Sequence, residues 1–83
     1  MTNLLNLKPG EKGFVLRVDS EIGLKRRLRD IGFINGAEVM LLHSSPSGDP
    51  RAYKIKGAVI ALRNIDAKNI IIKKKSDDYE WRN

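Results

Sequence analysis

The chain has 83 residues, with 16 Lys and Arg against 10 Asp and Glu, and it contains no cysteine. A chain of this length forms one domain with a small core, and the lack of cysteine excludes disulfides and thiolate metal sites and favours the cytosol. The net charge of +6 favours an anionic partner, whether nucleic acid, an acidic protein face or a membrane surface. The longest apolar runs, 39–42 and 58–62, are too short for a membrane span.

A first strand is predicted over 13–19, where apolar residues alternate with other positions. Phe14, Leu16 and Val18 share one face of this strand and are expected to point into the core. The turn residues Pro9 and Gly10 precede it and lead the chain into the strand.

A short amphipathic helix is predicted next, because Leu24, Leu28 and Ile31 recur at the spacing of one helical face. These three side chains are expected to enter the core. The remaining directions of the helix carry a cluster of cations, namely Lys25, Arg26, Arg27 and Arg29.

Residues at both ends of this helix have capping chemistry. Asp19 or Ser20 is expected to accept the free N–H groups at its start, and Gly32 is expected to end it with a positive φ. A turn over 33–36 follows, and its first residue, Phe33, is expected to plug the end of a barrel. The alternative places Phe33 at the surface as an apolar spot rimmed with positive charge.

The rest of the chain predicts short strands joined by turns. Strands are expected at 37–45, 51–57, 58–63 and 69–75, with a loop at 44–50, a tight hairpin at Lys56-Gly57 and one helical turn at 64–68. Five short strands with turns about every ten residues, and one helix between the first two, predict a mainly β fold, a small closed or half-closed barrel. An open sheet with the helix laid across it is the alternative. The segment 76–83 is expected to be a flexible polar tail.

No catalytic constellation is visible. The chain has one histidine and no cysteine, and its carboxylates are scattered singly, so we expect no enzyme, no catalytic residue and no cofactor. His43 is a weak candidate metal ligand, because metal sites need several converging ligands.

Nucleic-acid binding is the main alternative to a solvated basic helix face. Lys and Arg side chains strengthen nucleic-acid binding through contacts with phosphates, but proteins that bind single-stranded nucleic acid also use aromatic side chains on which the bases stack. Phe33 and Tyr53 are the remaining aromatic candidates in the body of the chain. A small basic nucleic-acid-binding barrel therefore stays open as a second hypothesis.

Two stretches resemble one known family. The sequence "RRLRDIGFINGAEV" resembles the RLxxLGΦxxG signature, with Φ apolar, of ferrous iron transport protein A, the FeoA family, and "GDPRAYKIKGAVIALRNIDAKNIII" is similar to the second half of that family. The match covers about 4–72. The positions that fall on the pattern are Arg27, Leu28, Gly32, Gly36, Asp49, Pro50, Gly57, Ala61, Leu62, Arg63 and Ala67.

The resemblance implies an SH3-like barrel over 1–75. It further implies a cytoplasmic, non-enzymatic accessory protein that binds and modulates the membrane GTP-hydrolysing ferrous iron transporter FeoB. By analogy with SH3 peptide grooves, a partner surface is expected between the helix and the loop 45–51. The candidate partner-binding residues are Lys25, Arg29, Phe33, Asp49 and Arg51.

Two further possibilities follow from the same residues. An exposed edge strand would allow a homodimer. Direct carriage of ferrous iron is a weaker hypothesis, because one histidine and scattered acids do not favour a metal site.

Overall fold

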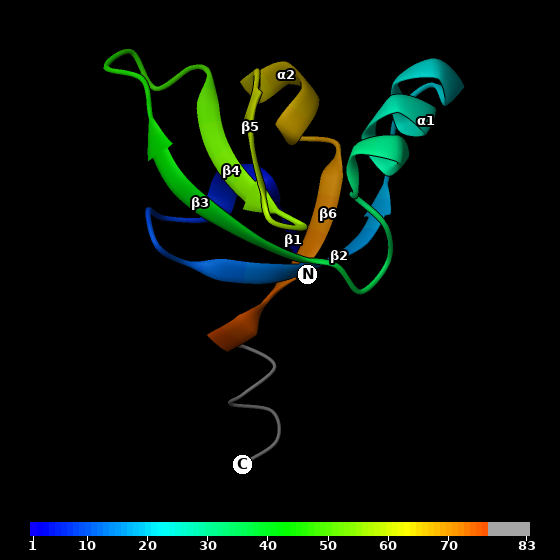
Figure 1. Cartoon of the computed structure of the whole chain (residues 1–83), viewed down its shortest axis with the longest axis horizontal. Helices are drawn as coiled ribbons and strands as arrows, with labels where there is room; N and C mark the ends of the chain where they lie inside the picture. The colour runs from blue at the N-terminus through cyan, green and yellow to red at the C-terminus, as the bar shows by residue number, and fades with distance from the viewer. Residues whose placement is uncertain (77–83) are drawn as a thin grey trace.

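The computed structural model describes residues 1–76 and shows a six-stranded antiparallel sheet with one ten-residue helix (Figure 1). The strand order across the sheet is β1-β6-β2-β3-β4-β5. In chain order the elements are β1 (Thr2–Asn3), the 3-10 turn η1 (Leu4–Asn6), β2 (Lys12–Val18), α1 (Ile22–Ile31), β3 (Glu38–Ser44), β4 (Arg51–Ile55), β5 (Ala58–Leu62), α2 (Asn64–Ala67) and β6 (Ile70–Lys74).

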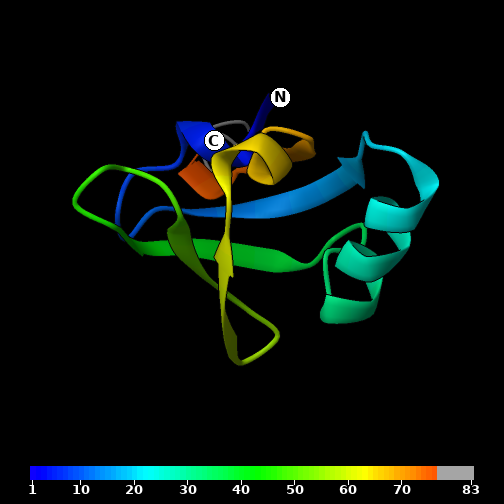
Figure 2. The same ribbon diagram turned by 90° about the horizontal axis from the view of Figure 1, so that it is seen from above.

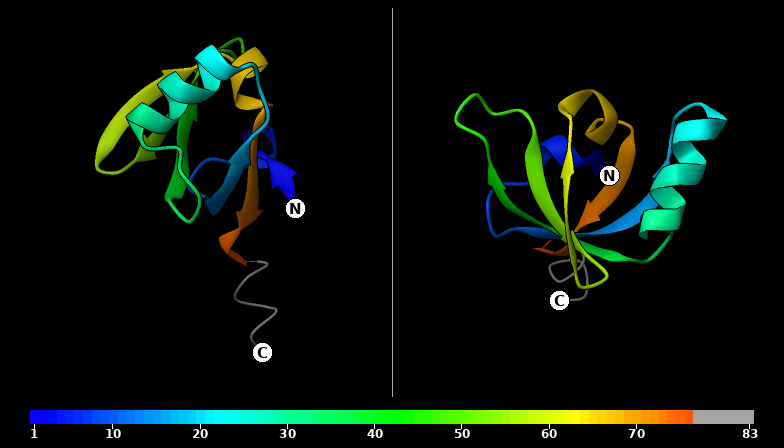
Figure 3. Two further views of the ribbon diagram at one scale, coloured as in Figure 1. Left: turned by 90° about the vertical axis from the view of Figure 1, so that its right-hand side faces the viewer. Right: turned by 45° about the horizontal axis from the view of Figure 1, so that its top comes forward.

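The sheet is strongly curved (Figures 1 and 3). Its outermost strands, β1 and β5, each pair with one neighbour within residues 1–76, while α2 packs against η1. The barrel is therefore partly open, in line with the predicted half-closed form. β1 and η1 have weak local signals, and sequence reasoning missed both.

The strand β2 carries a β-bulge between Val15 and Arg17, where its register with β6 shifts. One extra residue reverses the alternation of side chains. Val15 and Val18 are consequently both buried, whereas Phe14 and Leu16 are only half-buried. The prediction that Phe14 and Leu16 form the buried face is wrong, and that for Val18 is confirmed.

Helix α1 lies against one side of the barrel (Figure 2). Leu28 is buried and Leu24 packs against the core, as predicted, but Ile31 is 40% exposed. The reason is local: Gly32 has φ of 133° and turns the chain, and Phe33, only 1% exposed, enters the core after it. Phe33 thus plugs the barrel, which confirms the first of the two alternatives.

The cap of α1 differs from the expected one. The carboxylate of Glu21 accepts from the backbone N–H groups of Gly23 and Leu24 at 2.8 and 2.6 Å. Asp19 is engaged elsewhere, because it pairs with Arg17 at 3.0 Å. A glutamate replaces the predicted Asp19 or Ser20 at the start of the helix.

The second half of the chain follows the prediction closely. Lys56 and Gly57, with φ of 52° and 79°, make the tight β4–β5 hairpin. The core combines residues from every element except β1, namely Leu4, Leu7, Val15, Val18, Leu28, Phe33, Ala37, Val39, Leu41, Tyr53, Ile55, Leu62, Ala67, Ile70 and Ile72. No helix within residues 1–76 is long and apolar enough to cross a membrane. The predicted flexible tail, apart from Ser76, lies outside the described residues.

Candidate functional site

The exposed side of α1 combines apolar and cationic side chains. Ile22 is 75% and Ile34 is 42% exposed, and both line a hollow of about 530 Å³ with Lys25, Arg26 and Arg29. These five residues are called the α1 surface below. Exposed apolar groups within a rim of charge are typical of protein interfaces.

A second hollow adjoins the first and is also lined by Lys25, Arg29 and Ile34. Phe33 contributes to its wall but is only 1% exposed. The predicted residues Lys25, Arg29 and Phe33 are therefore neighbours in space. Phe33 shapes this surface from beneath and offers almost no area to a partner.

The cations of the α1 surface are not neutralised within the part of the chain that the structure describes. Ion pairs there involve Lys12 and Arg17 on β2, Lys74 on β6 and Lys75 just after it, and none includes Lys25, Arg26 or Arg29. Asp30 lines the same hollow but forms no ion pair with these cations among the described residues, so an acidic partner would meet them without first breaking an existing pair.

Asp49 and Arg51 are engaged in holding the loop before β4. The Asp49 carboxylate accepts from the Asn64 backbone N–H at 2.9 Å, and the Asn64 side chain donates to the Gly48 carbonyl at 3.0 Å. The Arg51 guanidinium donates to the Leu5 carbonyl at 3.0 Å. Both side chains thus fasten the loop to α2 and η1.

The predicted candidate residues fall into two groups that the structure keeps apart. The β3–β4 loop and α1 stand at opposite sides of the barrel, with β5 and α2 between them (Figures 1 and 3). The two hollows described above, both lined by α1 residues, include neither Asp49 nor Arg51, and Arg51 instead lines a hollow beside η1. The structure thus does not bring the helix and the loop together, and Lys25 and Arg29 remain candidate partner-binding residues on α1.

Tyr53 supplies an unusual buried polar group below the loop. The residue is fully buried, and its hydroxyl makes no hydrogen bond within the described part of the chain. Burial raises the pKa of this hydroxyl, an effect that the nearby Arg51 partly offsets. With Phe33 and Tyr53 both buried, neither aromatic candidate is available to stack on a nucleic-acid base.

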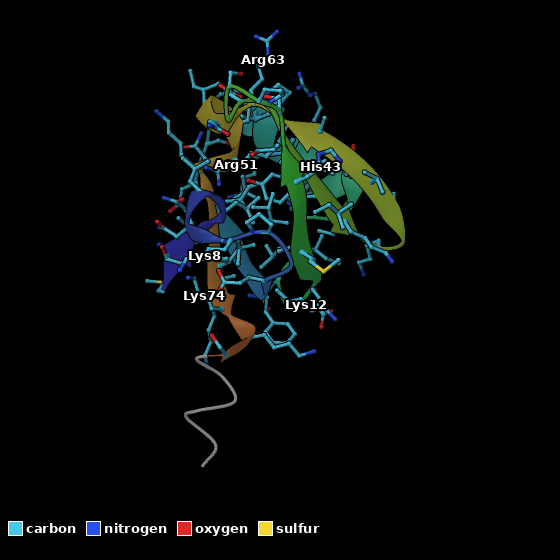
Figure 4. The ribbon with its side chains drawn as sticks, turned by 90° about the vertical axis from the view of Figure 1, so that its left-hand side faces the viewer. Lys8, Lys12, His43, Arg51, Arg63 and Lys74 are labelled. Atoms are coloured by element: carbon cyan, nitrogen blue, oxygen red, sulfur yellow. The ribbon has the colours of Figure 1, made fainter. Side chains whose placement is uncertain are left out.

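His43 lies exposed near the end of β3 (Figure 4). Within residues 1–76, no three His, Cys, Asp or Glu side chains come close enough to hold a metal ion. Among these residues His43 does not meet the converging ligands that a site for a transition metal needs.

Sequence reasoning missed Ile22 and Ile34 of the α1 surface. Both are apolar residues that fall outside the helical stripe of Leu24 and Leu28. Their position outside this buried stripe could have indicated an exposed binding surface. This indication is weak, because single exposed apolar residues are common.

Comparisons with known proteins identify the family. The model of the FeoA domain matches residues 2–74. The solution structure of FeoA from Chlorobium tepidum is 32% identical, with a TM-score of 0.83, and the match covers 88% of this chain and 70% of that one.

The crystal structure of FeoA from Stenotrophomonas maltophilia, a prokaryotic SH3 domain protein solved with zinc, is 27% identical with a TM-score of 0.79, and the match covers 88% and 91% of the two chains. A fusion of Fe(2+) transport protein A with the Fe(2+) transporter FeoB from Porphyromonas gingivalis is 28% identical over 67 residues, which are 81% of this chain and 8% of that protein. The fold is thus the SH3-like barrel that the sequence predicted. On the extent of the domain match, the chain belongs to the FeoA family.

Proposed function

We propose that this chain is a cytoplasmic, non-enzymatic accessory protein of ferrous iron uptake, which binds and modulates FeoB through the α1 surface. The fusion protein from Porphyromonas gingivalis carries this proposal, because one polypeptide there joins a segment similar to this chain to the transporter. Fusion keeps two modules at high effective concentration and is useful where they act on each other.

The α1 surface has the chemistry that this role needs. Its exposed isoleucines supply apolar contact area, and Lys25 and Arg29 stand beside them without ion pairs among the described residues. We expect the matching patch on the cytosolic part of FeoB to be acidic at its rim and apolar at its centre. The basic charge then speeds and orients the encounter.

Affinity capture tests the proposal. The immobilised chain is incubated with detergent-solubilised FeoB, and the bound transporter is quantified with and without guanine nucleotide. The double variant Lys25→Glu, Arg29→Glu should lower affinity roughly tenfold or more, which corresponds to about 1.4 kcal/mol. The matched control Arg63→Glu, Lys68→Glu makes the same charge change at exposed positions around α2 and should bind like the unmodified chain.

Three outcomes would overturn this assignment. Equal capture by the α1 variant and the control would remove the α1 surface from the interface. An equal loss of affinity for FeoB in Asp49→Ala would show that the loop before β4 belongs to the interface. Capture that disappears after nuclease treatment would favour the nucleic-acid hypothesis.

A further inference from the structure

A second cationic and apolar surface lies on the outer face of the sheet. Lys12 on β2 is the register partner of Met40 on β3, Met40 is the partner of Lys54 on β4, and Lys54 is the partner of Val59 on β5. Register partners in a sheet share a face, so these four residues form one line across four strands. They are called the transverse row below.

The transverse row is open to solvent and cationic. Val59 is 64% exposed, Lys12 and Lys54 are exposed, and Met40 is half-buried. Together with Lys56 and Glu38, three of these residues line a hollow of about 250 Å³. Among the described residues, Lys54 and Lys56 form no ion pair, whereas Lys12 pairs with Glu38 at 3.7 Å.

The chain leaves the barrel at the beginning of this row. Lys74 on β6 is the register partner of Gly13 on β2, and Lys75 reaches Glu38 at 3.2 Å. Lys75 and Ser76 share a hollow with Lys12, which also lines the hollow of the transverse row. Figure 4 shows Lys12 and Lys74 toward the same end of the molecule, with Arg63 toward the opposite end.

The residues beyond Ser76 have the complementary chemistry. The sequence over 77–83 is "DDYEWRN", with three acids, one base and two aromatic rings. From β2 to β5 the row extends about 14 Å, at about 4.8 Å per strand, and seven extended residues reach at most about 23 Å. The segment is thus long enough to follow the whole row.

We infer that residues 77–83 of the chain dock along its own transverse row. The carboxylates of Asp77, Asp78 and Glu80 neutralise Lys54 and Lys56. The rings of Tyr79 and Trp81 cover Met40 and Val59, where a thioether and lysine stems favour aromatic contact. The inference is independent of the proposed function, because the row and the α1 surface share no residue.

The tryptophan at position 81 is the only one in the chain, so its fluorescence reports on this segment alone. At about 0.01 M salt, where the Debye length is about 30 Å, we expect Trp81 emission at shorter wavelength, and weaker quenching by acrylamide, than in a free peptide of residues 76–83. At about 1 M salt the Debye length is about 3 Å, and both differences should shrink.

Charge variants locate the contact. Lys54→Glu, Lys56→Glu should abolish the emission shift, while Lys54→Arg, Lys56→Arg and the matched control Arg63→Glu, Lys68→Glu should keep it. Far-UV circular dichroism and thermal unfolding verify that each variant is folded.

Each remaining outcome overturns the inference. Emission equal to that of the free peptide at low salt would show that the segment does not dock. A shift that survives Lys54→Glu, Lys56→Glu in a folded protein would place the contact elsewhere. A shift that grows with protein concentration would show docking on a second copy of the chain.

Discussion

The substitution Gly32→Ala tests how the end of α1 is built into the barrel. Gly32 has φ of 133°, where a residue with a Cβ is strained, and an added Cβ would lie 2.8 Å from the Lys56 Cγ atom of the β4–β5 hairpin. Backbone strain in such a region costs about 1–3 kcal/mol, and the close contact adds about 1 kcal/mol after partial relaxation. We expect a total loss of about 2–4 kcal/mol in the free energy of unfolding.

Thermal and urea unfolding measure this loss. For a domain of this size, each 1 kcal/mol shifts Tm by roughly 4–8 °C, so Gly32→Ala should lower Tm by at least about 8 °C. Gly36→Ala is the matched control: Gly36 has φ of 88° and no atom of the described residues within 4 Å of its added Cβ. Gly36→Ala should lower the free energy of unfolding only by the cost of backbone strain, about 1–2 kcal/mol.

A double-mutant cycle separates strain from contact. In a Lys56→Ala background the Lys56 Cγ atom is gone, so the cost of Gly32→Ala should fall by about 1 kcal/mol. Equal losses for Gly32→Ala and Gly36→Ala, together with no coupling to Lys56→Ala, would refute the explanation that the helix end is fitted against the hairpin.

Three further substitutions test other contacts. Tyr53→Phe removes a buried hydroxyl that lacks a partner among the described residues and should raise the free energy of unfolding by about 1 kcal/mol. Because burial raises the pKa of this hydroxyl, the free energy of unfolding should be unaffected by its ionisation below about pH 10 and should fall above that pH. Measurements of Tm against pH should show a smaller fall for Tyr53→Phe. Glu21→Ala removes both capping hydrogen bonds of α1 and should lower urea stability by about 1 kcal/mol, with Glu21→Gln losing less. Asp49→Ala should expose the Asn64 backbone amide, which now donates a hydrogen bond to the Asp49 carboxylate, and faster hydrogen exchange at that amide would show it.

The sequence predicted best those elements whose formation depends on residues close together in the chain. Leu24 and Leu28 carry the helical period, Gly32 supplies the positive φ that ends α1, and Lys56-Gly57 makes the hairpin. Each of these signals acts within a few residues and needs no knowledge of the rest of the fold. The same holds for the single turn α2 after β5.

Two of the errors have different origins, a distant strand pairing in one case and a local ion pair in the other. The bulge between Val15 and Arg17 is a property of the β2–β6 pairing, and it reverses an alternation that looked regular in the sequence. Asp19 has a capping side chain, but its pair with Arg17 leaves the cap to Glu21. Local propensity was outweighed by the surroundings in both cases.

The candidate site shows the same division. Lys25 and Arg29 are four residues apart on one helix, so their proximity was predictable. Their supposed neighbours Asp49 and Arg51 belong to a loop that hydrogen bonds draw toward α2 and η1. The prediction of a groove between the helix and the loop required the relative positions of these two segments, which depend on the order of the strands in the sheet.

Two of the cationic surfaces within residues 1–76 arise in different ways. On α1 the cations are successive residues, whereas Lys12 and Lys54 lie 42 positions apart and meet through two strand pairings. A β-sheet gathers residues across strands and disperses those along one strand. Since the two cationic surfaces share no residue, charge reversal can be tested on each of them separately.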